Sequence, residues 1–278
     1  MTYEQSPVRP VEPVAPWQGG KSRLADTIIS WINSVDHACY AEPFCGMGGI
    51  FLRRTKRPKA EVMNDYSRDV SNFFRILQRH YVCFIDMIRW QLSTRDDFER
   101  LVNTPPDTLT DLERAARVLY ILKTGFGGQI RTRSFGVDTT GSGRFDITTL
   151  VPELERLHSR LAGVTIECLH FFEFIRRYDR PHTLFYLDPP YWGCEDDYGK
   201  NLFERADFQK LAEQLAGIKG KFILSLNDTP GVRETFGAFK IEGVKTTYTI
   251  SKDGGPQEAA EVLIHNLPAV PKLQPDLF

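Results

Sequence analysis

Residues 184–192 read Leu-Phe-Tyr-Leu-Asp-Pro-Pro-Tyr-Trp, and this stretch decides the fold that we expect. The apolar run at 184–187 predicts a buried strand. Two prolines end that strand, because proline has no N–H to donate to a sheet. Asp188 therefore follows directly after the strand. In open α/β sheets ligands bind at this carboxyl edge, so we expect Asp188 in a binding site.

The four residues Asp188-Pro189-Pro190-Tyr191 suit a planar ring that carries an exocyclic amine. Asp188 and the Pro189 carbonyl can each accept one hydrogen of an NH2 group. Tyr191 offers a face for stacking, and Trp192 either adds a second wall or packs in the interior. The alternative is a rigid strand exit capped by an acid, without any ligand.

Length and composition limit the classes of protein. The chain has 278 residues, 41% of them hydrophobic, which suits one large α/β domain or a domain with an insertion. A formal charge of −1 means that nucleic acid, if bound, is bound by local patches. The five cysteines form no CxxC pair, so we expect reduced thiols and no metal site. Without an apolar span or a signal peptide, we expect a cytoplasmic protein that has no membrane partner.

A Gly-Gly-Lys-Ser stretch at 19–22 invites comparison with a phosphate-binding P-loop. That motif needs a glycine where this chain has Ala15, and no strand precedes it, so we reject a P-loop. Apolar residues from Leu24 to Ile32 recur at helical spacing. Lys21 and nearby amides either meet a charged ligand at this helix start or merely open the helix.

A second binding element is expected around residues 39–65. Residues 39–44 predict a strand that ends at Pro43, followed by a glycine turn at 45–49 and a helix. This arrangement is typical of nucleotide-binding sheets. Asp65 follows the next strand, where a carboxylate can hold ribose hydroxyls or cap the helix expected at 67–80. The basic run at 53–59 is expected at a solvated helix end, with phosphate contact as the alternative.

Residues 81–165 differ from the rest. They contain helical patterns at 84–92 and 112–123 and then a glycine-rich loop that continues to Arg144. The loop carries three arginines against one acid, interleaved with aromatic rings: Arg131, Arg133, Arg144, Phe126, Phe135 and Phe145. Such a loop suits phosphate contact and base stacking, and the alternative is a mobile linker.

Strand and helix patterns then alternate to the end of the chain. Strands are expected at 164–169, 183–187, 221–226, 239–249 and 260–266, the last two as a hairpin, with helices at 171–178, 205–218 and 230–236. Alternation on both sides of the helical region predicts one α/β sheet with a helical insertion.

The ordered set of motifs resembles the Dam-type (D12 class, alpha-ordered) N6-adenine DNA methyltransferases of bacteria and phages. Matching stretches run in the family's order over most of the chain: Trp17 to Lys21, Glu42 to Gly48 with Phe51-Leu52, Asn64-Asp65, Asp188 to Tyr191, Phe203 with Phe208 and Leu211, and Ser225 to Thr229. Any one of these stretches is weak by itself, whereas the ordered set is highly specific.

The resemblance implies a Rossmann-like class I sheet that binds S-adenosyl-L-methionine (AdoMet), with no metal. It implies a catalytic domain of residues 1–67 and 166–267, a DNA-binding target-recognition insertion at 68–165 and a flexible tail at 268–278. The cofactor-binding residues expected from it are Trp17, Lys21, Glu42, Pro43, Phe44, Gly46, Gly48, Asp65, Phe172 and Asp188. Asp188 to Tyr191 are the expected catalytic residues, and Arg131, Arg133, Arg144 and Phe126 the expected DNA contacts.

Two departures from the family's pattern limit how far the roles of its residues carry over to this chain. Where members often carry Asp-Phe for the cofactor adenine, this chain has His170-Phe171-Phe172-Glu173. Its loop at 126–145 resembles only loosely the segment that family members use on GATC, so that specificity does not carry over.

The expected activity is methyl transfer from AdoMet to N6 of adenine in double-stranded DNA, site-specific or of low specificity, by a monomer or weak dimer. Since N6 is inaccessible inside a duplex, the adenine has to flip out. Alternatives are cytosine-N4 transfer, whose enzymes usually carry Ser in place of Asp188, and glutamine methylation, whose enzymes carry Asn. Two further alternatives are a module that binds AdoMet and DNA without catalysis and, as the weakest, a nucleotide hydrolase. The recognition sequence and any restriction or prophage origin are not encoded in these motifs.

Overall fold

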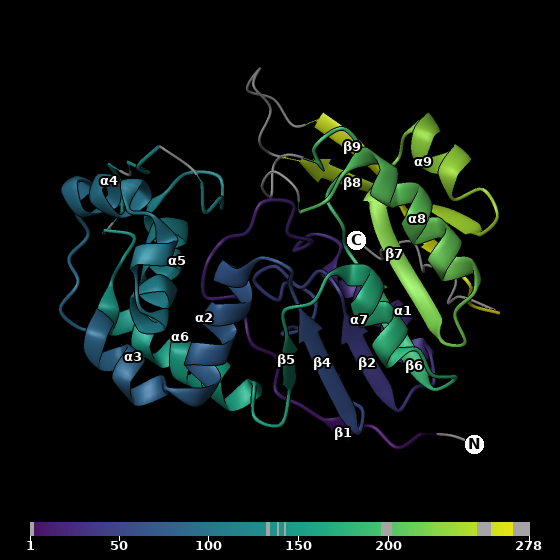
Figure 1. Cartoon of the computed structure of the whole chain (residues 1–278), viewed down its shortest axis with the longest axis horizontal. Coiled ribbons are helices and arrows are strands. Elements are labelled where there is room, and N and C mark those ends of the chain that lie inside the picture. Colours follow the sequence, from purple (N-terminus) through teal and green to yellow (C-terminus); the bar gives the residue numbers. More distant parts are fainter. Residues whose placement is uncertain are drawn as a thin grey trace.

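The central sheet has seven strands in the order β5-β4-β2-β6-β7-β9-β8 (Figure 1). The computed structural model describes residues 3–131, 134–137, 139–141, 143–195, 202–248 and 257–268, with backbone alone at 245–248 and 257–260. The strands span β2 (Cys39–Glu42), β4 (Ala60–Asn64), β5 (Thr165–Glu167), β6 (Thr183–Leu187), β7 (Lys221–Asn227), β8 (Lys240–Tyr248) and β9 (Gln257–His265). A separate two-stranded pair joins β1 (Ser6–Pro7) to β3 (Lys56–Arg57).

The order in which the chain adds strands to the sheet reverses at β2. From β2 the chain adds β4 and β5 on one side, and then crosses to add β6 and β7 on the other, all parallel. β9 lies antiparallel between β7 and β8, so the expected terminal hairpin is confirmed. A crevice forms where such an order reverses, at the carboxyl ends of β2 and β6.

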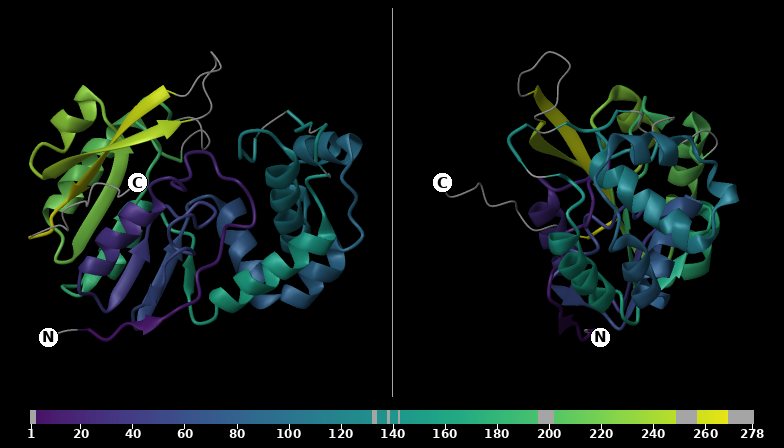
Figure 2. Two further views of the ribbon diagram at one scale, coloured as in Figure 1. Left: turned by 180° about the vertical axis from the view of Figure 1, so that it is seen from behind. Right: turned by 90° about the vertical axis from the view of Figure 1, so that its left-hand side faces the viewer.

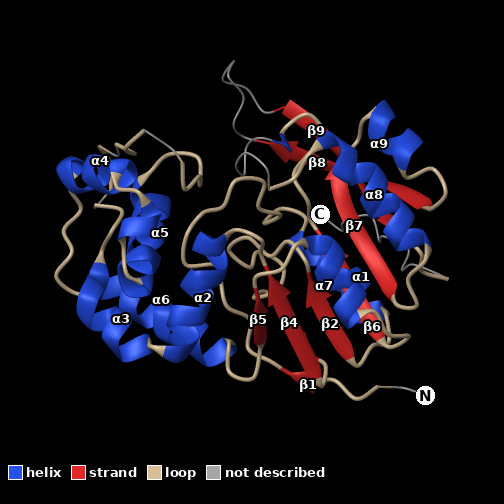
Figure 3. Ribbon diagram, in the orientation of Figure 1, coloured by secondary structure: helices blue, strands red, loops and turns tan. Residues whose placement is uncertain are grey.

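Both faces of the sheet are buried, which explains the continuous apolar run in β6. Successive side chains of a strand point to opposite faces. Leu184 and Tyr186 pack in the core with α1 (Ala25–Ser34), whereas Phe185 and Leu187 pack in a second core with α7 (Phe171–Tyr178) and α8 (Arg205–Ala216). α9 (Pro230–Thr235) lies near α8 (Figure 3). Its Val232 belongs to the second core.

Five helices gather beside the β5 edge of the sheet (Figures 1 and 2). They are α2 (Arg68–Arg79), α3 (Tyr81–Ile88), α4 (Arg95–Asn103), α5 (Asp111–Thr124) and α6 (Ile147–Arg160), with a short 3-10 turn η1 (Pro106–Thr108) before α5. A capping box formed by Thr110 and Glu113 begins α5, satisfying backbone N–H groups that a helix start leaves unpaired. Helices α4 and α6 were not expected from the sequence.

Buried charge joins these helices to the sheet. Glu61 of β4 accepts hydrogen bonds from Arg160 of α6 at 2.8 Å, from Arg54 at 2.8 Å and from Arg57 at 2.7 Å. The side chains of Glu61, Arg54 and Arg160 are each only 1% exposed. A buried carboxylate surrounded by guanidinium groups is stable only because its charge is compensated on several sides.

Two expectations for residues 45–59 were wrong. The glycine turn is followed by consecutive turns up to residue 53 and not by a helix, and the chain then enters β3. The basic run is therefore no solvated helix end, since Arg54 is buried against Glu61. Elsewhere, no helix in the described part of the chain is long and apolar enough to cross a membrane. The expected flexible tail lies outside the described residues from 269 onward.

Candidate active site

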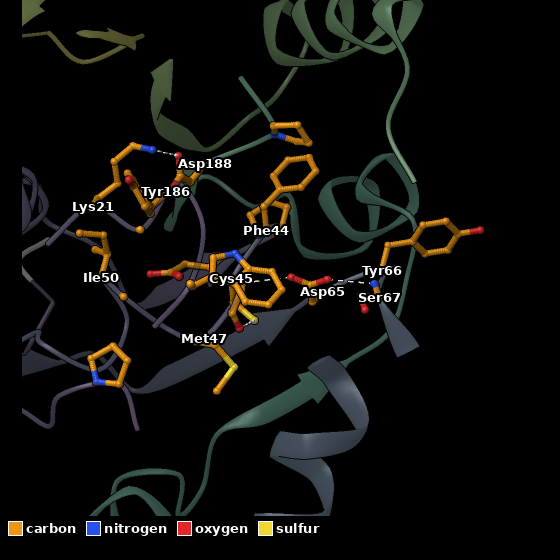
Figure 4. A pocket seen from close by; sticks show the side chains of 18 of the residues that line it. Lys21, Phe44, Cys45, Met47, Ile50, Asp65, Tyr66, Ser67, Tyr186 and Asp188 are labelled. Atoms are coloured by element: carbon orange, nitrogen blue, oxygen red, sulfur yellow. Dashed lines mark hydrogen bonds and ion pairs between the residues drawn. The ribbon is translucent and has the colours of Figure 1, made fainter. Parts of the chain in front are cut away.

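A cavity of about 330 Å³ opens at the carboxyl ends of β2, β4 and β6, the crevice expected from the strand order (Figure 4). Its walls include most of the residues expected to bind a cofactor: Trp17, Lys21, Glu42, Pro43, Phe44, Gly46, Asp65 and Asp188. Segments far apart in the sequence thus converge on one site. Pro190 of the catalytic motif also lines it, whereas Pro189 and Tyr191 are not among the residues that line it.

Asp188 stands directly after β6 and is held through one oxygen. Lys21 Nζ lies 2.6 Å from Asp188 Oδ1, and the Ser225 hydroxyl donates to the same oxygen at 3.0 Å. Among the described residues, no group hydrogen-bonds to Oδ2. Burial raises the pKa of Asp188, and the Lys21 ammonium opposes that rise. The carboxylate is therefore oriented, with one oxygen available to a further donor.

The rest of the motif is fixed by its neighbours. The Tyr191 hydroxyl donates to Glu261 Oε1 of β9 at 2.6 Å. The Lys21 ammonium lies 4.5 Å from the centre of the Tyr191 ring. Asn227, the last residue of β7, accepts from the Trp192 N–H at 2.9 Å and donates to its carbonyl at 3.0 Å. The loop after β6 is thus tied to β7 and β9, and its geometry does not depend on proline alone.

Asp65, after β4, anchors the glycine turn. Its Oδ2 accepts from the Gly46 N–H and its Oδ1 from the Ser67 N–H, both at 2.9 Å. Burial raises the pKa of Asp65 to about 6. Gly46 has a φ of +48°, and a Cβ there would lie 2.4 Å from the Trp17 indole nitrogen. Glycine is required at 46 because Trp17 packs directly on its backbone.

Glu42, at the end of β2, is a third acid in the cavity wall, after Asp188 and Asp65, and is buried. The Tyr40 hydroxyl donates to Glu42 Oε1 at 2.6 Å. Burial raises the pKa of Glu42 to about 8, so at neutral pH the side chain is mostly a neutral acid. The Arg54 guanidinium stacks on the Tyr40 ring, 3.6 Å from its centre, and connects this wall to the buried charge around Glu61.

Two of the residues expected to bind the cofactor do not line this cavity. Gly48 is not among the lining residues, and a Cβ built there would meet the Leu52 side chain at 2.9 Å. Phe172 is 48% exposed and lies outside the cavity. The cavity wall is formed instead by His170, which caps the start of α7, and by Phe171, the first residue of that helix.

The residues expected to contact DNA lie on the loop between α5 and α6. Phe126, Arg131 and Arg144 are exposed, and Arg133 lies outside the described residues. The other two loop aromatics are packing residues and not stacking surfaces. Phe145 is buried against Tyr120, and Phe135 packs edge-on against Phe98.

Several wall residues were missed by sequence reasoning. They are Met47, Ile50, Ser67, His170, Phe171 and Tyr186, with Ser225 behind them holding Asp188. Tyr186 and Ser225 lie within apolar strands, and an isolated hydroxyl in such a strand is the sequence feature that could have marked them as site residues. The two hydroxyls lie 2.9 Å apart and form one polar line that ends on Asp188.

The sheet is the mixed α/β sheet that was expected, with β9 antiparallel beside β7, and together with the family match given next it confirms the expected fold class of an AdoMet-dependent methyltransferase. The family model of the D12 class N6 adenine-specific DNA methyltransferases matches residues 17–250. The chain belongs to this family.

Curated relatives agree with that assignment. A type II methyltransferase, M1.LlaDCHI from Lactococcus lactis subsp. cremoris, is 23% identical over 92% of this chain and 95% of its own. The DNA adenine methylase of Haemophilus influenzae is 26% identical over 90% of this chain and 91% of its own. A solved precorrin-8w decarboxylase from Methanobacterium thermoautotrophicum overlaps only loosely, with 10% identity over 93% of this chain and 98% of its own and a TM-score of 0.40.

The family fixes the reaction. The protein is an enzyme that transfers a methyl group from AdoMet to N6 of adenine in DNA, as expected from the ordered motifs, and the cytosine-N4 alternative is not favoured. The donor set of the cavity fits AdoMet, since it combines an acid for ribose hydroxyls, an ammonium for a carboxylate and apolar walls for a ring. No cluster of three metal-ligating side chains occurs in the described part of the chain.

Proposed function

We propose that the methyl group is transferred in the cavity at the ends of β2, β4 and β6, with Asp188 as the residue that holds the adenine amine. The observation that carries this proposal is the asymmetric environment of Asp188. Oδ1 is occupied by Lys21 and Ser225, while Oδ2 has no partner among the described residues. An oriented acceptor of this kind is what an NH2 group requires.

The N6 lone pair of adenine is delocalised into the ring, which makes the amine a poor nucleophile. Asp188 Oδ2 and the Pro189 carbonyl each accept one N–H of the amine and draw it toward a tetrahedral geometry. Bound AdoMet supplies an electrophilic methyl group on a sulfonium. Most of the acceleration then comes from alignment, for which about 7–11 kcal/mol is available in well-oriented reactions.

Lys21 connects cofactor binding to the catalytic motif. Its ammonium lies over the Tyr191 ring and against Asp188, where it covers the face on which we propose that the flipped base stacks. Stacking on that face therefore displaces the ammonium. The carboxylate of the methionine part of AdoMet is the alternative partner that we assign to Lys21, so a loaded site is prepared for the base.

We assign the remaining wall residues by their chemistry. Asp65 holds the ribose hydroxyls, and the apolar wall of Phe44 and Phe171 accepts the adenine ring of the cofactor. Trp17 and Gly46 shape the turn beside it. Glu42 acts as a neutral hydrogen-bonding acid in the wall, because its pKa lies near 8.

The helical region is our candidate for target recognition. The five helices lie on one side of the sheet (Figure 1), and the loop between α5 and α6 presents Phe126, Arg131 and Arg144 to solvent. We propose that this loop contacts the backbone and bases of double-stranded DNA. We further propose that the enzyme acts in the cytoplasm as a monomer or weak dimer.

The test is the variant Asp188→Ala, assayed for transfer of labelled methyl groups from AdoMet to adenine-unmethylated plasmid DNA. We expect a loss of at least about 100-fold, the scale for removal of one preorganised hydrogen-bonding group, while S-adenosylhomocysteine still binds measurably. The matched control is Asp228→Ala. Asp228 follows β7, the neighbouring strand, but pairs with Arg233 at the surface, so transfer should stay within about twofold. Near-normal transfer by Asp188→Ala would refute the role.

A further inference from the structure

The loop after α5 folds back on itself as a narrow hairpin. An antiparallel bridge joins Gly125 to Phe135, and the Phe126 N–H donates to the Ser134 carbonyl at 2.9 Å. At its base, the Gly136 N–H donates to the Thr124 carbonyl at 2.7 Å. The hairpin is therefore built onto the last turn of α5.

One side of this hairpin is docked on the N-terminal segment. The Gln18 N–H donates to the Gly128 carbonyl at 3.0 Å, and the Gln129 side-chain amide donates to Gln18 Oε1 at 2.5 Å. Gly128 is buried and has a φ of +68°. A Cβ at 128 would lie 3.0 Å from backbone atoms of Pro16, Trp17 and Gln18, so only glycine allows this approach.

The segment beneath the hairpin is also a wall of the cofactor cavity. Trp17 lines that cavity and packs on Gly46. A smaller cavity lies beside the hairpin, and four residues line both cavities: Trp17, Asp65, Ser67 and Leu202. Its hairpin wall runs from Gly128 to Arg131, one of the proposed DNA contacts. A single layer of residues thus separates the proposed DNA surface from the cofactor.

We infer that Gly128 and Gln129 are positioning residues that couple DNA binding by the hairpin to cofactor binding in the cavity. The inference rests on the proposed function, in which the hairpin contacts DNA. A cofactor that packs against Trp17 restrains residues 16–18, on which the hairpin is docked. DNA that restrains the hairpin restrains the same segment. Such coupling is reciprocal, and typical values are about 5–150-fold in affinity.

The experiment measures the Kd of S-adenosylhomocysteine by calorimetry on the full chain, without and with saturating adenine-unmethylated plasmid DNA. We expect DNA to tighten binding by at least about fivefold in the wild type. In Gly128→Ala and in Gln129→Ala this ratio should fall below about twofold, although each variant still binds both ligands. Thermal unfolding of each variant checks that the chain remains folded.

Gly127→Ala is the matched control. Gly127 also has a positive φ, +85°, but no atom lies within 4 Å of a Cβ built there. Alanine therefore introduces the same backbone strain without touching Trp17 or Gln18, and we expect the wild-type ratio to persist.

Three results would overturn the inference: a wild-type ratio below about twofold, a wild-type ratio retained by both Gly128→Ala and Gln129→Ala, or an equal loss in Gly127→Ala. Failure of the proposed function looks different. In that case the wild-type chain itself transfers no methyl group to plasmid DNA, or Asp188→Ala transfers it normally.

Discussion

The functional side chains of the cofactor cavity are fixed by hydrogen bonds, whereas those of the hairpin beside it are exposed. In the cavity Asp65 accepts two backbone N–H groups, and Asp188 is bonded to Lys21 and Ser225. On the hairpin Arg131 is exposed, and the exposed fraction of Phe126 is 55%. Alignment for a chemical step needs fixed groups, whereas a DNA surface can adapt on contact. Substitutions in and behind the cavity should therefore have large effects that are independent of salt, and substitutions on the hairpin small, salt-dependent ones.

The largest effect on stability is expected at the buried charge that joins the helical region to the sheet, around Glu61 of β4 and Arg160 of α6. Glu61→Ala leaves Arg54 and Arg160 buried without their common partner, which should destabilise the fold by about 3–5 kcal/mol. Urea unfolding measures this difference. The control is Glu173→Ala, whose surface pairs with Arg176 and Arg177 should contribute little to stability. Equal losses in the two variants would contradict the importance of the buried junction.

Glu42→Gln tests the neutral acid in the cavity wall. Because burial raises the pKa of Glu42 to about 8, the folded protein binds more protons than the unfolded chain between the unfolded pKa of about 4.5 and pH 8. The stability of the wild type relative to the variant should therefore fall as pH rises through this window, by about 4 kcal/mol between pH 5 and pH 9. Unfolding midpoints at pH 5 and pH 9 give the comparison. A difference that stays constant between the two would show that Glu42 ionises normally.

Asp65 should make cofactor binding sensitive to acid. With a pKa of about 6, its carboxylate is ionised at pH 7 and mostly protonated at pH 5. If the ionised form holds the ribose hydroxyls, the affinity for S-adenosylhomocysteine falls about tenfold between these values. Asp65→Asn should bind more weakly at pH 7 and lose this pH dependence. An unchanged pH profile in the variant would assign the titration to another group.

The smallest effect is expected on the hairpin. Arg131→Ala removes one exposed cation, so DNA affinity should fall only a few-fold, and the slope of log K against log salt should decrease by about 1. Binding titrations at three salt concentrations measure this slope. Arg176→Ala is the control, because Arg176 pairs with Glu173 on α7 and should leave the slope unchanged. A salt-independent loss for Arg131→Ala would indicate base readout instead of phosphate contact.

The same contrast explains which features the sequence could predict. A short apolar run followed by proline, as in β2 and β6, is a local signal that predicts a buried strand and its end. These two strand ends place Gly46 and Asp188 at one edge of the sheet. Tertiary contacts carry no such local signal. Nothing near Ser225 in the chain indicates that its hydroxyl orients Asp188, and nothing near Arg54 indicates its burial against Glu61.

Errors of prediction also follow from local ambiguity. The helix α6 contains Pro152, which removes one helical hydrogen bond and weakens the helical pattern. Phe171 and Phe172 are adjacent aromatics on α7, whose bounds match the helix expected at 171–178. Knowing the bounds of the helix does not tell which of the two rings lines the cavity, and it is Phe171 that does so while Phe172 is exposed.

The central claim is that Asp188 Oδ2 accepts the amine of the flipped adenine while Oδ1 stays bonded to Ser225. A crystal structure of the chain with S-adenosylhomocysteine and an adenine-containing duplex measures this directly. We expect N6 of the extruded base to lie about 2.7–3.2 Å from Oδ2, with the Pro189 carbonyl as the second acceptor. A base whose amine is bound elsewhere, with Asp188 turned away from the cofactor, would contradict the account.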